Sequence, residues 1–216
     1  MPVDITIRLY RYHELSDEAK EKARDWYISS IYWPDELDFV IDHWAEIAKK
    51  LGFSIESNGG PWWDLYQDSF YIGRGSFCRP DDEDLDDLEN EYKENPDVLS
   101  VISDVRAVSQ HMSATIKDGR IYDVDGEAHH LTQPSILAPD KEWNVYFKEA
   151  KEFRESERTL IQEALRSLQY LGLKWLQDEV KYRESEEVIE EVMRDNDWLF
   201  HKDGAPAFFH EDGTSA

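Results

Sequence analysis

The fold is decided by the stretch Met112-Ser113-Ala114-Thr115-Ile116-Lys117-Asp118-Gly119-Arg120-Ile121-Tyr122-Asp123-Val124. Two runs rich in β-branched and apolar residues flank Asp118-Gly119, a dipeptide suited to the two-residue type I′ turn of a β-hairpin. We therefore expect two strands here that complete an antiparallel sheet.

The rest of the chain alternates between strand and helix patterns. Strands are predicted over residues 3–12, 53–56 and 62–77, and a short one over 198–200. Helices are predicted after the N-cap residues Ser16 and Ser185, and over residues 34–52, 96–111 and 139–182. Strands grouped with helices, without regular alternation, indicate an α+β fold with an antiparallel sheet of about five strands and helices packed on it. We expect one domain over residues 1–204 and a disordered tail over residues 205–216.

Charge limits the classes of partner. The chain has 48 Asp and Glu against 24 Lys and Arg, a formal net charge of −24 on 216 residues. Such a protein repels nucleic acid and anionic membranes, so we expect a basic protein as partner and no direct binding of nucleic acid or membrane. Hydrophobic residues make up 40% and aromatic residues 13%, which predicts a folded chain despite the charge.

The sequence also indicates the cellular compartment of the protein. Cys78 is the single cysteine, which fits a reducing environment. No basic and apolar leader follows Met1, and no run of about 18 apolar residues occurs, so we expect a soluble protein of the cytoplasm of the cell in which it is made.

The charge is concentrated in one segment. Residues 81–97 contain ten Asp and Glu and one Lys. Leu85, Leu88 and Tyr92 follow a helical i, i+3, i+7 spacing that would hold a helix to the body while carboxylates face solvent. A solvated helix that only promotes solubility is the alternative. In the functional interpretation, these solvent-facing carboxylates imitate a phosphate backbone or contact a basic partner protein. The candidate partner-binding residues are Asp81, Asp82, Glu83, Asp84, Asp86, Asp87 and Glu91.

Signals for catalysis or metal binding are weak, and we predict neither an enzyme nor a cofactor. A cysteine between Phe77 and Arg79 is usually buried and inert. Residues 123–126 do not fit the ligand spacing of a calcium loop. The adjacent His129 and His130 are typical of a solvated loop rather than a metal site. The glycine-rich residues 73–76 are typical of a turn or bulge. The competing hypothesis is a metal-dependent enzyme with paired carboxylates, for which Asp64 and Asp68 are the candidates.

Three stretches carry a family resemblance. They are the run from Tyr10 to Arg24, the run Ser113-Ala114-Thr115-Ile116-Lys117, and an ending made of Glu184 to Glu191, Asn196 to Phe200 and Asp203-Gly204. Together they resemble a family of small acidic proteins of tailed bacteriophages and prophages. Its members are often labelled antitoxins of a toxin–antitoxin stability system. Arg74 stands where that family has an acidic residue, so the role of its loop does not transfer.

Together these observations favour a phage-encoded, non-enzymatic inhibitor that neutralises a basic bacterial protein. The target would be a toxin or a nucleic-acid-acting defence factor. A phage structural or replication-associated subunit is a third interpretation, and the oligomeric state stays open.

Overall fold

The computed structural model describes residues 7–30, 33–126 and 140–207, which fall into two compact units. The first unit combines residues from 1–38 and 178–216, and the second is formed by residues 39–177. The last turns of α5 (Asp140–Arg183) belong to the first unit, so one helix contributes residues to both. The prediction of a single domain over residues 1–204 stays a prediction.

The first unit joins the two ends of the chain. Its strands β1 (Tyr10–Arg11) and β8 (Leu199–Phe200) pair antiparallel. They are accompanied by η1 (Tyr12–Glu14), α1 (Asp17–Ser30) and α6 (Glu186–Asp195). The predicted caps are present, since Ser16 Oγ accepts from Ala19 N–H and Ser185 Oγ from Val188 N–H. The buried core of this unit consists of Tyr12, Leu15, Ala19, Ala23, Ile189, Met193 and Phe200.

The second unit is built on a four-stranded antiparallel sheet of order β2-β5-β6-β7. Its strands are β2 (Phe53–Ile55), β5 (Arg74–Cys78), β6 (Ser113–Lys117) and β7 (Arg120–Asp125). The predicted hairpin is confirmed: φ is 49° at Asp118 and 71° at Gly119, as a type I′ turn requires. A separate two-stranded sheet is formed by β3 (Trp62–Asp64) and β4 (Ser69–Tyr71).

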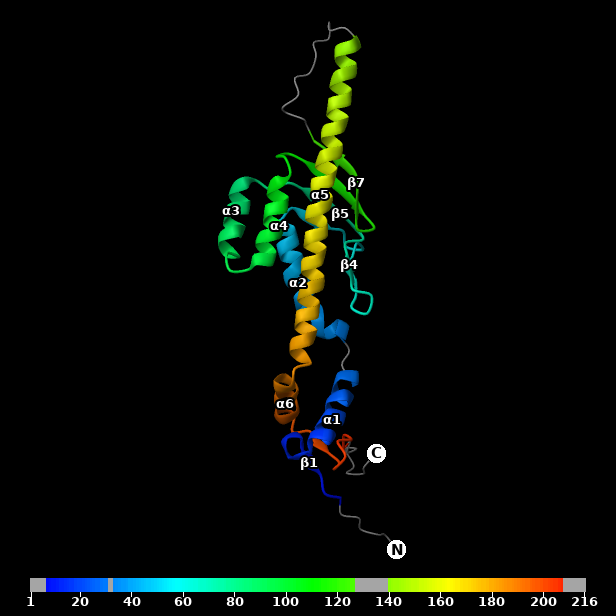
Figure 1. Cartoon of the computed structure of the whole chain (residues 1–216), viewed down its shortest axis with the longest axis vertical. Coiled ribbons are helices and arrows are strands. Elements are labelled where there is room, and N and C mark those ends of the chain that lie inside the picture. Colours follow the sequence, from blue (N-terminus) through cyan, green and yellow to red (C-terminus); the bar gives the residue numbers. More distant parts are fainter. Residues whose placement is uncertain (1–6, 31–32, 127–139, 208–216) are drawn as a thin grey trace. The chain divides into compact units, whose positions relative to one another are not determined.

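Helices cover one face of the four-stranded sheet. Side chains alternate between buried and exposed along β5 and β6, which gives the sheet one apolar face and one solvent face. Within the second unit, α4 (Pro96–Ala107) lies between α3 (Asp82–Glu91) and α5 (Figure 1). The Trp44 indole of α2 (Trp33–Lys50) donates to the Leu168 carbonyl of α5 at 2.9 Å, and Ser167 of α5 donates to Asp104 of α4 at 2.6 Å.

The sheet edge at β7 is closed by side chains. Ile121 N–H donates to Gln162 Oε1 of α5 at 2.9 Å, Val124 N–H to Asp123 Oδ1 at 3.0 Å, and Gly126 N–H to Asp125 Oδ1 at 2.9 Å. These backbone donors are therefore satisfied without a further strand.

The α+β class is confirmed, but several boundaries were wrong. The sheet has four strands rather than about five, because the expected N-terminal strand pairs with β8 in the first unit instead. Residues 62–77 break into β3, β4 and β5. Of the strand expected over residues 3–12, only Tyr10–Arg11 pairs, and residues 1–6 lie outside the described residues. The glycine-rich residues 73–76 belong largely to β5 rather than to a turn. The predicted tail starts too early, since Ala205 and Ala207 hydrogen bond with His201 and Leu199, while residues 208–216 lie outside the described part.

Candidate functional site

The acidic segment forms α3, as the leucine spacing predicts. Asp82, Glu83 and Asp84 occupy its first turn, where the helix dipole favours negative charge. Leu85 and Leu88 are buried at 0% and 3% exposure, whereas every carboxylate of the helix is exposed. The helix therefore presents its charges to solvent along two sides of a buried apolar stripe.

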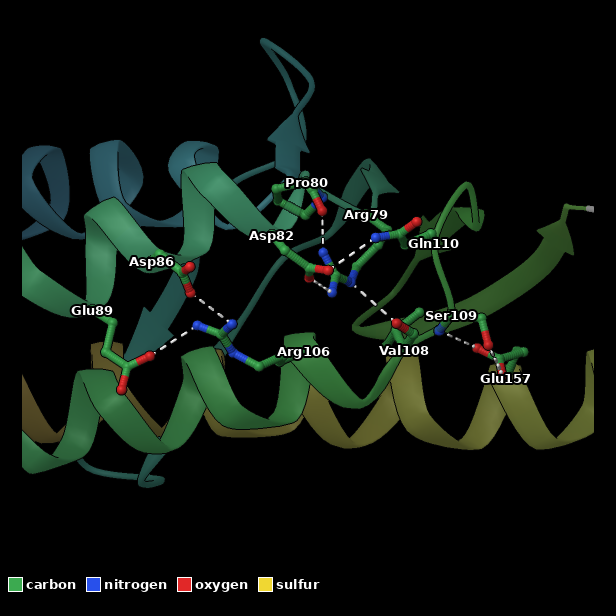
Figure 2. A network of polar contacts seen from close by, with 10 residues as sticks. All are labelled: Arg79, Pro80, Asp82, Asp86, Glu89, Arg106, Val108, Ser109, Gln110 and Glu157. Carbon is green, nitrogen blue, oxygen red and sulfur yellow. Dashed lines mark hydrogen bonds and ion pairs between the residues drawn. The ribbon is translucent and has the colours of Figure 1, made fainter.

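On one side, an inner row of carboxylates is neutralised within the fold. The inner row consists of Asp82, Asp86 and Glu89. The Arg106 guanidinium of α4 binds Asp86 and Glu89, each at 2.8 Å (Figure 2). These two carboxylates raise the pKa of Arg106, with the hydrogen bond that Arg106 donates to Asp86 as the largest cause.

Arg79 anchors the beginning of the inner row. Its side chain is only 2% exposed, and its Nη2 lies 2.6 Å from Asp82 Oδ1. Its remaining donors bind the Val108 carbonyl at 3.1 Å and the Pro80 carbonyl (Figure 2). Hydrogen bonds from Arg79 and then Gln110 lower the pKa of the Asp82 carboxyl below its ordinary value. A buried cation is costly unless paired, so Asp82 has a structural role.

On the other side of α3, a second row faces a groove of about 1020 Å³. This groove row consists of Asp81, Asp84, Asp87 and Glu91. The remaining lining, which completes what we call the α3 groove, is Glu46, Lys49, Lys50, Gly52, Cys78, Arg79, Pro80, Leu88 and His111. The groove is thus lined by five carboxylates and by three cations, Lys49, Lys50 and Arg79.

Pairing within the groove row is incomplete. Glu91 binds Lys50 at 2.7 Å, and this hydrogen bond is the main cause that raises the pKa of Lys50. Asp81, Asp84 and Asp87 make no ion pair with any residue that the structure describes. The groove is therefore left with uncompensated negative charge.

The predicted site residues consequently separate into three groups. The structure brings Asp81, Asp84, Asp87 and Glu91 together at the groove. It assigns Asp82 and Asp86 to internal ion pairs, and Glu83 is exposed outside both rows. The division follows the helical period, which the sequence contains. The positions of Lys49, Lys50 and Arg106 beside α3 come from the fold and have no local signal.

The structure also places Cys78 and the carboxylate pair Asp64 and Asp68. Cys78 is exposed in the groove, not buried. Asp64 Oδ1 accepts the backbone N–H groups of Tyr66 and Gln67, and Asp68 accepts from Gln177 of α5. Asp64 thus stabilises the turn between β3 and β4 from within, and Asp68 attaches this turn to α5.

The described part of the chain has neither a metal-binding cluster nor a membrane-spanning helix. No group of three or more His, Cys, Asp or Glu is placed there to hold a metal ion, and His129 and His130 lie outside that part. Within the same residues, no helix combines the length and apolar character needed to cross a bilayer.

Comparisons with protein-family models, curated proteins and solved structures find no match for the chain. The resemblance to phage proteins therefore stays a hypothesis.

Proposed function

We propose that the protein is a non-enzymatic acidic binding protein that neutralises a basic bacterial protein through the groove row of α3. The observation that carries the proposal is the contrast between the two sides of this helix. Asp82 and Asp86 are paired inside the fold, whereas Asp81, Asp84 and Asp87 border the groove and form no ion pair with a described residue. A partner cation can therefore pair with them without breaking an existing ion pair.

The spacing of the groove row supports imitation of nucleic acid. Asp81, Asp84 and Asp87 are three residues apart, which corresponds to about 4.5 Å of helix axis per carboxylate. One strand of duplex DNA carries one phosphate per roughly 3.4 Å. The two charge densities are of the same order, so a phosphate-binding surface is the kind of target that fits.

The class of target follows from this chemistry. A toxin or defence factor that acts on nucleic acid presents Lys and Arg where phosphates bind, and the groove row would occupy that surface. The origin in a phage or prophage and the action in the bacterial cytoplasm rest on the resemblance of the sequence ends. No cofactor is required for such binding.

The experiment compares two variants of equal net charge. The first carries Asp81→Asn, Asp84→Asn and Asp87→Asn. The control carries Glu56→Gln, Glu149→Gln and Glu163→Gln, three exposed carboxylates of the second unit that form no ion pair with described residues. Wild-type protein is immobilised, exposed to bacterial lysate at low salt and eluted with a salt gradient, and the captured basic protein is then purified.

Association rates of that protein are then measured for both variants. We expect the groove variant to associate at least about tenfold more slowly at low salt and the control to stay close to wild type, because local charge steers encounter. Equal rates for the two variants would assign the effect to net charge and refute the role of the groove.

A further inference from the structure

A row of cations crosses the solvent face of the four-stranded sheet. In the strand register, Arg74 of β5 is directly opposite Lys117 of β6, and Lys117 is directly opposite Arg120 of β7. All three side chains are exposed. Directly opposed residues of antiparallel strands point to the same face, so these residues form one cation row.

This arrangement is unfavourable for the isolated fold. Like charges directly opposite each other destabilise a sheet. Three carboxylates lie nearby: Glu56, which continues the β2–β5 register opposite Arg74, and Asp118 and Asp123 of the β6–β7 hairpin. None of them forms an ion pair with the cation row among the described residues. In a chain with 48 Asp and Glu, three adjacent cations that form no ion pair with a described residue leave room for an external anion.

Two exposed aromatic side chains contact the cation row or the residue that precedes it. Trp62 is 55% exposed, and its indole lies against Gly73, the residue before Arg74. Tyr122 is 68% exposed, and Lys117 Nζ lies 5.8 Å from the centre of its ring. Aromatic faces beside cations are the pair of features that bind a base and a phosphate together.

The dimensions of the row fit a small anion. Adjacent strands lie about 4.8 Å apart, so three cations on neighbouring strands span roughly 10 Å. This span is on the scale of the phosphate chain of a nucleotide. Across the second unit, α3 and β7 lie on opposite sides in Figure 1. Because the Debye length is about 8 Å at physiological salt, the carboxylates of α3 do not prevent contact binding at the row.

We propose that the cation row binds the phosphates of a nucleoside triphosphate, with the base stacked on Trp62 or Tyr122. This site is separate from the α3 groove and does not depend on the function proposed for it. The sequence alone did not reveal it, because the cations and aromatics alternate across neighbouring strands rather than along the chain.

Titration calorimetry with full-length protein tests the proposal, with ATP, tripolyphosphate and adenosine as separate probes. The test variant carries Arg74→Ser, Lys117→Ser and Arg120→Ser. The control carries Lys93→Ser, Lys151→Ser and Arg154→Ser, which removes the same charge from exposed positions of the second unit. A third variant, Trp62→Leu with Tyr122→Leu, removes the stacking faces and keeps the cations.

We expect ATP to bind wild type and the control alike, and its Kd to rise at least about tenfold in the test variant. ATP should bind more tightly than tripolyphosphate, and this advantage should disappear in the aromatic variant. Absence of ATP binding to wild type, or equal weakening in the test variant and the control, overturns the proposal. Equal affinity for ATP and tripolyphosphate overturns the stacking of the base. If an oligothymidylate binds more tightly than ATP, and its binding depends on the same residues, then the ligand of the cation row is single-stranded nucleic acid and the proposal of a free nucleotide is wrong.

Discussion

The attachment of α3 to the second unit can be tested by Leu85→Ala. The Leu85 side chain is fully buried, on the side of α3 that separates the two carboxylate rows. Buried Leu→Ala substitutions cost about 2–5 kcal/mol of unfolding free energy, depending on how far the site collapses. α3 has only 10 residues and borders an open groove, so partial collapse is easy and we expect the lower part of the range, about 2–3 kcal/mol.

Urea unfolding followed by far-UV circular dichroism measures this change. In a protein of this size the same loss corresponds to a Tm lower by about 4–12 °C. Asp84→Ala is the matched control: it truncates an exposed side chain one residue away and should change the free energy by less than about 0.5 kcal/mol. If Leu85→Ala costs no more than Asp84→Ala, packing of the leucine does not hold α3, and the separation of the two rows loses its basis.

Three further outcomes are expected. Because Arg79 and Gln110 lower the pKa of Asp82, its stabilising contribution is present above the unfolded-state pKa and is lost as pH falls through the lower folded-state value. Urea midpoints of Asp82→Asn should therefore decline less steeply than those of wild type as the solution is acidified, and parallel curves would contradict this. Gly119→Ala should lower the unfolding free energy by about 1–2 kcal/mol, because φ there is +71°; a neutral result would show that the turn relaxes. Unfolding should be a single transition by tryptophan fluorescence and by circular dichroism, since α5 contributes to both units, and two separate transitions would exclude a single domain.

Local signals account for most of the fold that could be predicted. The Asp118-Gly119 turn is predictable from two adjacent residues that accept positive φ angles, although their N–H groups also donate to the carbonyls of Gly73 and Ile72. The Ser185 cap is local. The division of residues 62–77 was missed because aromatic residues recur on both sides of the turn between β3 and β4. This turn depends on the hydrogen bonds of Asp64 with nearby N–H groups and of Asp68 with Gln177, which lies 109 residues away.

The candidate site was predictable only in part, for the same reason. Leu85 and Leu88 predict the helix and its exposed carboxylates from spacing alone. Which carboxylates are neutralised depends on Arg106, 20 residues from Asp86, and on Lys50, 41 residues from Glu91. The acidic segment therefore indicated a region, and tertiary contacts determine which of its charges are left for a partner.

The closed edge at β7 restricts how this sheet can meet other molecules. An edge strand with unsatisfied N–H groups is a template for strand addition and for aggregation. Since Gln162, Asp123 and Asp125 already accept the N–H groups of Ile121, Val124 and Gly126, an incoming strand would have to displace these side chains. We therefore expect recognition at β7 to use the side chains of its solvent face, and concentrated solutions to resist joining of sheets along this edge.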